Sequence, residues 1–246
     1  MKPTISPVGD CAISIDFGQV IDPKINRHIR QTIERIQELH LEGIIELVPT
    51  YCALLLQYDA MLYSYSELCN IIEPTLEQSV ADNDNELVTV VEIPTVYGGE
   101  FGPDLGFVAS HNNLSEDEVV SIHSGTDYLV YMLGFIPGFT YLGGMDPRIA
   151  TPRLSSPRTL IPAGSVGIAG AQTGTYPSDS PGGWQIIGRT PVTMYDMSKE
   201  QAALLSAGDY VRYVPIDETE YNRIKALGSD YVPSMYEVEV GELRGY

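Results

Sequence analysis

Glycine and proline are concentrated in the second half of this chain, and this concentration is the strongest constraint on its fold. The stretch from Tyr128 to Thr193 holds 11 of the 23 glycines and 8 of the 17 prolines. These residues separate short apolar runs such as Ser165 to Ala169 and Trp184 to Ile187, so a long helix is excluded there. Short strands joined by many tight turns predict a compact β-barrel.

The N-terminal part of the chain instead alternates segments with strand and helix periodicity. The expected elements, in chain order, are a strand from Ala12 to Phe17, a helix opened by Asp22 and Pro23, strands from Ile44 to Val48 and from Tyr51 to Tyr58, a helix opened by Ser66, and a strand from Leu87 to Ile93. Pro74 is expected to kink the second helix or end it early. This order, βαββαβ, is the ferredoxin-like arrangement.

The polar stretch from Ala81 to Glu86 is the best candidate for a boundary between two domains. We therefore expect an α+β protein, with a ferredoxin-like βαββαβ domain over residues 1–86 and a β-barrel domain over residues 87–246. Two helices are expected in the second domain. One begins at the capping box of Ser115 and Glu118, and the other runs from Glu218 to Leu227, before an acidic C-terminal tail.

The charge balance and the cysteine usage exclude several classes of function. The chain carries 33 Asp and Glu against 14 Lys and Arg, a net charge of −19 that would repel a nucleic-acid backbone. It has no apolar run long enough for a transmembrane helix, and its first residues lack the features of a signal peptide. Its three cysteines and four histidines show no metal-binding spacing. We therefore expect a reduced, cytoplasmic protein with no bound metal, no nucleic-acid partner and no membrane contact.

The glycine-rich half contrasts with this acidic background. From Tyr128 to Thr193 it has four arginines, no lysine and only two acids, a local net charge of +2. The arginines are Arg148, Arg153, Arg158 and Arg189. An arginine fork matches two oxygens of a carboxylate or phosphoryl group, so an anionic ligand is one interpretation. The other is that these arginines bind loop carbonyls or the acids of a partner, and the sequence leaves both open.

Three further features each have two interpretations. The run from Pro162 to Gly174 could bring backbone N–H groups close to an anion, but it has no Walker A lysine and no following helix, so it also fits a strand and turn. Trp184 could cover a pocket or fill a core. His123 lies in the last turn of a helix, whose dipole favours the protonated form, so it could supply positive charge or be structural.

Several motifs in the chain resemble those of one family, that of the 5-oxoprolinase B subunit, also called KipI or allophanate hydrolase subunit 1. They lie at Val96 to Leu105, at Tyr131 to Phe139 and through the long block from Tyr141 to Pro191. That block includes Pro162-Ala163-Gly164-Ser165-Val166, Ala169-Gly170-Ala171-Gln172-Thr173-Gly174, Ser180-Pro181-Gly182-Gly183-Trp184 and Ile187-Gly188-Arg189-Thr190-Pro191. The resemblance covers nearly the whole chain.

The resemblance implies a ferredoxin-like N-terminal domain followed by a cyclophilin-like β-barrel. It also implies a subunit that is inactive alone and binds the C subunit of 5-oxoprolinase in a heteromer. Together with the A subunit, the complex converts 5-oxo-L-proline to L-glutamate and hydrolyses ATP, any Mg²⁺ being held by the nucleotide. Two alternatives come from the same family: inhibition of a sporulation-type histidine kinase, and the carboxyltransferase module of a urea carboxylase or allophanate pathway enzyme.

The expected site residues follow from combining this resemblance with the residues above. The expected catalytic residues are Arg158, Arg189 and His123, which would place positive charge around a transferring phosphoryl group or a substrate carboxylate. The expected substrate-binding residues are Gln172, Tyr176, Ser165 and Gly164. A site completed by the C subunit would explain why the chain has no complete nucleotide-binding loop.

Overall fold

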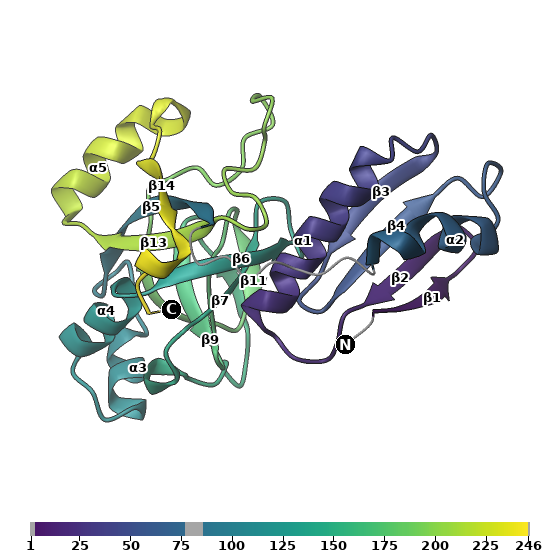
Figure 1. The fold of residues 1–246 in the computed structure, drawn as a ribbon. Coiled ribbons are helices and arrows are strands. Elements are labelled where there is room, and N and C mark those ends of the chain that lie inside the picture. Colours follow the sequence, from purple (N-terminus) through teal and green to yellow (C-terminus); the bar gives the residue numbers. More distant parts are fainter. Residues whose placement is uncertain (1–2, 77–85, 246) are drawn as a thin grey trace. The chain divides into compact units, whose positions relative to one another are not determined.

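A computed structural model describes residues 3–76 and 86–245 of the chain. These residues form two compact units, one on each side of residues 77–85. The domain boundary expected at residues 81–86 therefore falls mostly outside the described residues. Within the described ranges, no helix is long and apolar enough to span a bilayer. Each unit has a hydrophobic core of its own, and Figure 1 labels the elements that build it.

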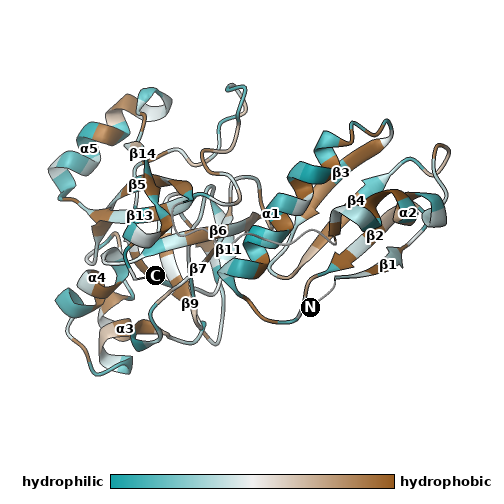
Figure 2. Cartoon of the chain, in the orientation of Figure 1, coloured by the Kyte–Doolittle hydropathy of each residue, from teal (hydrophilic) through white to brown (hydrophobic). Residues whose placement is uncertain are grey.

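The smaller unit is a four-stranded antiparallel sheet with two helices on one face (Figure 1). Its elements are β1 (Thr4–Val8), β2 (Ala12–Asp16), α1 (Pro23–Glu38), β3 (Ile44–Pro49), β4 (Ala53–Tyr58) and α2 (Tyr65–Leu76). The strand order in the sheet is β1-β2-β4-β3. Alternate residues of β2 and β4, such as Ile13, Ile15 and Leu54, are fully buried against the helices. Figure 2 shows β3, at the edge of this sheet, as largely hydrophobic and α1 as largely hydrophilic on its visible side.

The helix starts of this unit depend on local side-chain caps. Asp22 caps α1, as expected, by accepting a hydrogen bond from the backbone N–H of Lys24 at 2.8 Å. The start expected at Ser66 is wrong, because Ser64 and Glu67 form the capping box of α2 instead. The early end expected at Pro74 is also wrong. The described part of the helix runs through Pro74 to Leu76, and the proline removes only the one hydrogen bond that an N–H at this position would make to the carbonyl of Asn70.

The four positions of a ferredoxin-like sheet are present, but one is filled by a different strand than the sequence suggested. The strand from Leu87, placed last in the βαββαβ order, pairs in the larger unit. The edge position beside β2 is taken by β1, which joins β2 through a short turn at Gly9. A hairpin this local closes at little entropic cost. The proline-containing segment Thr4–Val8 is tolerated because it lies at the sheet edge.

The larger unit is built on an eight-stranded sheet that curls into a barrel, as the glycine and proline pattern predicted. Its strands are β5 (Leu87–Tyr97), β6 (Asp127–Leu133), β7 (Thr140–Gly143), β9 (Ser165–Ala169), β10 (Gln172–Thr175), β12 (Gln185–Arg189), β13 (Tyr210–Pro215) and β14 (Met235–Glu239). The order is β10-β9-β12-β5-β13-β6-β7, and β14 pairs with β5. The two ends of this path approach each other, since Gly174 of β10 faces the carbonyl of Thr140 in β7. A separate two-stranded ribbon is formed by β8 (Arg158–Ile161) and β11 (Ser180–Gly182).

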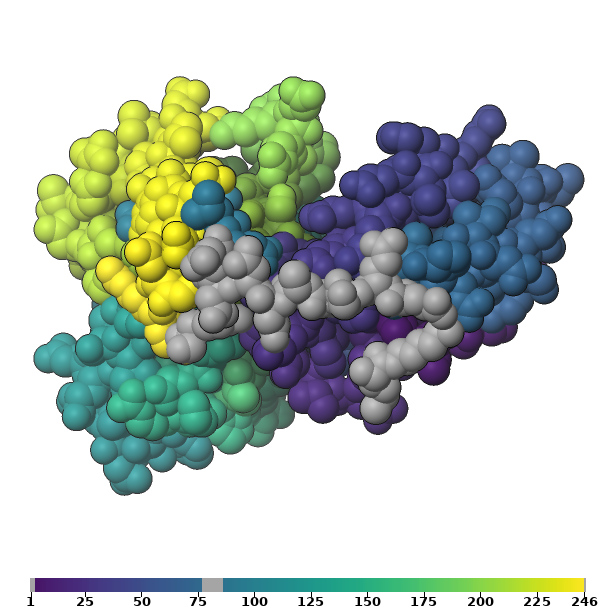
Figure 3. Space-filling view, viewed as in Figure 1, coloured from purple at the N-terminus to yellow at the C-terminus, as the bar shows by residue number. Residues whose placement is uncertain are grey.

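The C-terminal segment adds a strand to the sheet of the larger unit. β14 pairs antiparallel with the first half of β5, and Figure 3 shows this segment as a yellow layer on the surface of the larger unit. Below it, Arg212 forms a two-pronged ion pair with the fully buried carboxylate of Asp127, both N–O distances being 2.6 Å. The same carboxylate accepts the backbone N–H of Arg244, and Arg212 also contacts the hydroxyl of Tyr236. The acidic tail expected from the sequence is therefore held by a strand pairing and a buried charge pair.

Among the described residues of the larger unit, three α-helices border the barrel (Figure 1). They are α3 (Leu105–His111), α4 (Glu116–Ser124) and α5 (Glu218–Leu227). The capping box of Ser115 and Glu118 and the end of α4 at Gly125 are as expected. α3 was not anticipated, because its seven residues are too few for helical periodicity to emerge.

Candidate functional site

A cavity of about 450 Å³ lies where the turn before β9, the end of β12 and α5 meet. We call it the arginine pocket. Its lining residues are Pro162, Ala163, Gly164, Pro177, Asp179, Arg189, Thr190, Pro191, Val192, Thr193, Tyr221 and Lys225. Two of the predicted site residues, Arg189 and Gly164, therefore share one cavity, and α5 adds a second cation to it.

The wall of this pocket requires glycine at position 164. Gly164 has a φ of +79°, and a Cβ on it would lie 2.2 Å from the carbonyl oxygen of Thr190. The turn is tied to its neighbours on both sides. The N–H of Gly164 donates to the Tyr176 carbonyl at 2.7 Å, and its carbonyl accepts from the N–H of Thr190 at 2.8 Å. The glycine thus lets the turn pack directly on the end of β12, beside Arg189.

Arg189 is held between two aromatic rings. Its guanidinium carbon lies 5.9 Å from the centre of the Phe101 ring, and Phe101 in turn packs edge-on against Tyr221 of α5 at 4.8 Å. Burial raises the pKa of Tyr221, while the charge of Arg189 and a side-chain hydrogen bond from it act in the opposite direction. The Nε atom of Arg189 is buried and has no hydrogen-bond partner among the described residues.

A second cavity of about 220 Å³ is lined mainly by aromatic rings, and we call it the aromatic pocket. Its lining residues are Phe135, Phe139, Tyr141, Arg153, Tyr176, Pro181, Gly182, Gly183 and Trp184. Trp184 is 7% exposed and meets the rings of Phe139 and Tyr176 edge-on, so it both fills a core cluster and forms a pocket wall. Burial raises the pKa of Tyr176 to about 12, and the charges of Arg153 and Arg158 partly oppose that rise.

Arg158 is committed to a contact within the chain. One of its terminal nitrogens lies 2.7 Å from a carboxylate oxygen of Asp104, and the other donates to the carbonyl of Trp184 at 3.2 Å. The second oxygen of Asp104 accepts the N–H of Ile186 at 2.6 Å. Arg158 and Asp104 together therefore fix the start of β12, the strand that ends in Arg189.

His123 is fully buried and its imidazole is neutral. Its Nε2 lies 2.7 Å from the hydroxyl of Thr173, which donates its own proton to the carbonyl of Gly167. Nε2 therefore carries the ring proton, and Nδ1 accepts from the hydroxyl of Tyr97 at 2.8 Å. Burial lowers the pKa of His123 to about 3, which opposes the positive charge expected of it. The helix dipole cannot compensate for the loss of hydration in the barrel core.

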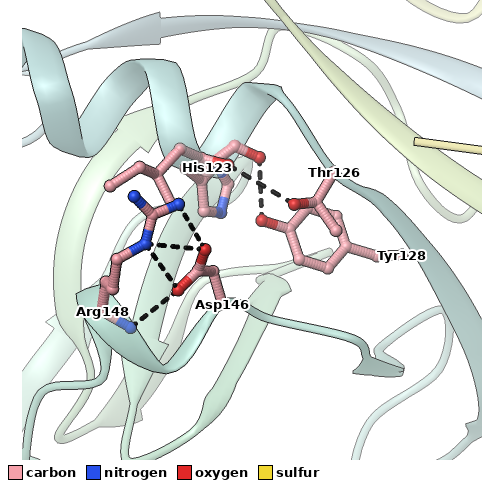
Figure 4. Close-up of polar contacts among 6 residues, drawn as sticks. His123, Thr126, Tyr128, Asp146 and Arg148 are labelled. Atoms are coloured by element: carbon pink, nitrogen blue, oxygen red, sulfur yellow. Dashed lines mark hydrogen bonds and ion pairs between the residues drawn. The ribbon is translucent and has the colours of Figure 1, made fainter. Parts of the chain in front are cut away.

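Figure 4 shows the surroundings of this histidine. The hydroxyl of Tyr128 donates to the backbone carbonyl of His123 at 2.8 Å, which fastens the end of α4 to β6. Nearby, Arg148 is occupied by Asp146, with an N–O distance of 2.6 Å. Arg148 is therefore paired within its own turn.

Gln172 lines neither pocket and lies away from the other predicted site residues that do. It begins β10, whereas Tyr176 follows the end of the same strand, which puts about 13 Å of extended chain between them. Ser165 pairs in register with Arg189 across β9 and β12, and it is fully buried. The structure thus brings Gly164, Ser165 and Arg189 together and places Tyr176 next to them, but it does not bring Gln172 or His123 to the arginine pocket.

Comparison with known proteins identifies the family. Residues 3–205 match the family described as carboxyltransferase domain, subdomain C and D. The B subunit of 5-oxoprolinase from Bacillus subtilis (strain 168) is 46% identical over 231 residues, which is 90% of this chain and 96% of that protein. The chain belongs to the family of 5-oxoprolinase B subunits.

Solved structures extend this likeness. An uncharacterised protein from Pyrococcus horikoshii, PH0987, is 49% identical, with a TM-score of 0.53, over 89% of this chain and all of that one. The K. lactis urea amidolyase superposes with a TM-score of 0.77 over 96% of this chain and 16% of that one, at 21% identity, which shows a shared fold alone. The motifs that carry the family resemblance include residues that line the two pockets. Gly164 and Arg189 line the arginine pocket, and Gly182 and Gly183 line the aromatic pocket.

Three residues of the arginine pocket and its support could not be identified as site residues from the sequence: Phe101, Tyr221 and Lys225. A partial signal existed, because Tyr221 and Lys225 are four residues apart in the expected terminal helix and so share one face. Nothing in the sequence, however, connects that helix with Arg189. The contact arises only because β13 carries the chain back alongside β5 before α5 begins.

Proposed function

We propose that this chain is the B subunit of an ATP-dependent 5-oxoprolinase that converts 5-oxo-L-proline to L-glutamate together with the C and A subunits of that enzyme. The observation that carries the proposal is the match along nearly all of both chains to a protein named as a 5-oxoprolinase B subunit. The arginine pocket supports it, since the reaction needs sites for a carboxylate and for phosphoryl groups. ATP is a co-substrate of the complex in this proposal.

The chemistry explains why cations are needed. An unstrained lactam resists attack by water, and phosphorylation of its carbonyl oxygen would create a better electrophile and a good leaving group. The charge that develops on the phosphoryl oxygens has to be stabilised by cations held in place beforehand. We assign this role to Arg189, with Gly164 and Ser165 shaping the pocket beside it.

The other predicted residues receive supporting roles in the proposal. Arg158 positions the start of β12 through Asp104 and Trp184 and so acts through Arg189. Tyr176 lines the aromatic pocket and would border the substrate. His123 keeps the barrel strand β10 in register through Thr173 rather than supplying charge. Gln172 would reach substrate only from the opposite end of β10, so its role would depend on a neighbouring protein of the complex.

Reconstitution tests the proposal. The purified chain should not release glutamate from 5-oxo-L-proline, and turnover should appear when the A and C subunits are added with ATP. In that complex, Arg189→Ala should reduce turnover by a factor of about 30 or more, because the loss of one cation at a developing charge costs about 2–4 kcal/mol. Arg158→Ala should also reduce turnover, together with the melting temperature, since its ion pair holds β12.

Arg148→Ala is the matched control, because this arginine lies in the same segment but pairs with Asp146 on the surface. It should leave turnover and assembly unchanged. Glutamate release by the isolated chain, or normal turnover of Arg189→Ala in an intact complex, would contradict the proposal. Turnover that requires a biotin-bearing partner would instead favour a carboxyltransferase module.

A further inference from the structure

Two neighbouring buried polar atoms, one on a residue that lines the arginine pocket and one on its strand partner, have no hydrogen-bond partner among the described residues. The Nε of Arg189 and the Oγ of Ser165 are both inaccessible to solvent and make no hydrogen bond among the described residues. The two residues are register partners in the β9–β12 pairing, so their side chains leave the sheet on the same face. An unsatisfied buried donor is unfavourable, and native proteins leave few of them. Of the residues that line this pocket, Arg189 therefore keeps a donor that no described residue satisfies.

The arginine pocket is lined by two cations that both contact one aromatic residue, Tyr221. The side chain of Arg189 donates a hydrogen bond to the hydroxyl of Tyr221, and the Nζ of Lys225 lies 5.7 Å from the centre of the Tyr221 ring. Arg189 reaches the pocket from β12 and Lys225 reaches it from α5, so the two charges come from separate elements. Like charges that line one cavity repel each other, and an anion between them would relieve that repulsion.

The acid of the pocket does not neutralise both cations. Asp179 also lines the cavity, and its Oδ1 accepts the backbone N–H of Ala163 at 2.8 Å. This hydrogen bond holds the turn that contains Gly164. With Arg189, Lys225 and Asp179 counted together, the lining keeps one net positive charge in a chain whose total charge is −19.

We propose that the arginine pocket binds a small oxyanion, a carboxylate or a phosphoryl group, between Arg189 and Lys225. The guanidinium offers its Nε and a terminal nitrogen to two oxygens after a rotation about its last side-chain bonds, and Lys225 closes the pocket from α5. In this proposal Lys225 binds the ligand, and Tyr221 positions the two cations. The inference depends on the proposed function only for the two ligands used to test it.

The test uses the full-length chain without its partner proteins, because every residue named comes from this chain. Two probes, 5-oxo-L-proline and inorganic phosphate, are titrated separately at low, constant ionic strength by calorimetry and ligand-observed NMR. The first probe carries only a carboxylate and the second only phosphoryl oxygens, so the pair distinguishes the two sources of the oxyanion. We expect one of them to bind.

Variants then locate the binding. Arg189→Gln should weaken it by a factor of about 10 or more, and Lys225→Gln by about 3 or more, as expected for loss of a charge-assisted contact. Arg223→Gln is the matched control, because Arg223 lies on the same helix but pairs with Glu220 in solvent. It should leave the affinity unchanged. Melting temperatures of all three variants are measured beside the titrations.

Two outcomes overturn the inference: no binding of either probe at millimolar concentration, or binding by Arg189→Gln as tight as that of the unaltered chain in a folded protein. An equal loss in Arg223→Gln and Lys225→Gln would also overturn it, since general electrostatic attraction would then explain the result. The two proposals can also fail separately. If phosphate binds and the binding depends on Arg189, but the reconstituted complex leaves 5-oxo-L-proline intact, the proposed function is refuted and the oxyanion site still stands.

Discussion

Acid should destabilise the larger unit through His123. The folded state holds this imidazole neutral, with a pKa of about 3, whereas an unfolded chain gives it an ordinary pKa near 6.5. Above pH 6.5 both states are neutral and the histidine has no effect on the pH dependence. Below pH 6.5 only the unfolded state takes up the proton, so the free energy of unfolding falls as the pH falls, until the folded pKa is reached.

The expected size follows from these two pKa values. Between pH 6.5 and about 3, each pH unit should lower the free energy of unfolding by about 1.4 kcal/mol, which gives about 2 kcal/mol at pH 5. His123→Gln removes the titration and keeps the polar contacts, because an amide oxygen can accept from Tyr97 while its N–H donates to Thr173. The variant should therefore lose this part of the pH dependence.

Urea unfolding at pH 7, 6 and 5 measures the effect. Trp184 is the only tryptophan in the chain and lies in a buried cluster of the larger unit, so its fluorescence reports on that unit. The difference between the two proteins cancels the contributions of other groups. If the unaltered chain and His123→Gln lose stability in parallel between pH 7 and pH 5, the reasoning about the neutral imidazole is wrong.

Two further substitutions test the fold around the site. Asp127→Asn should lower the free energy of unfolding by about 3–5 kcal/mol because it leaves the guanidinium of Arg212, 11% exposed, without its counter-charge, whereas Arg223→Ala in an exposed pair should cost less than about 1 kcal/mol. Equal effects in urea unfolding would contradict this. Gly164→Ala should destabilise the protein clearly more than Gly170→Ala. Both glycines have positive φ, and an alanine in that conformation costs about 1 kcal/mol at either position. Only at Gly164, however, would the new Cβ meet a backbone oxygen. Similar melting temperatures of the two alanine variants would show that the turn moves freely.

Features that depend on neighbours in the sequence could be predicted from it. Ser115 and Glu118 cap α4, Asp22 caps α1, and the strand from Ser165 to Ala169 has the expected bounds. Each rests on contacts between residues a few positions apart or on the periodicity of one segment. α5 likewise runs from Glu218 to Leu227, between a polar cap and a glycine.

Features that depend on partners far along the chain could not be predicted in this way. The strand from Leu87 has the same apolar pattern whichever sheet it joins, and β14 carries alternating acids that suggest a solvated tail. β5 joins the larger unit because it pairs along one edge with β13. Its other edge is covered by β12 only at Val96 and Tyr97, and β14 pairs with the remaining part of that edge, from Leu87 to Val91. A hydrogen-bonding edge left open is satisfied by whichever strand the topology delivers to it.

The same limit explains why the sequence could name four arginines but could not rank them. The local charge of +2 counted acids only between Tyr128 and Thr193, whereas the acid that occupies Arg158 is Asp104, 54 residues away. Arg148 finds Asp146 in its own turn, and Arg153 lies over the Trp184 ring. Arg153 and Arg189 both lie over aromatic rings, but of the four arginines only Arg189 keeps a buried side-chain nitrogen without a hydrogen-bond partner among the described residues. Because a charge becomes available for a ligand only when the fold leaves it uncompensated, the position of the site depends on the distribution of acids rather than on the arginines themselves.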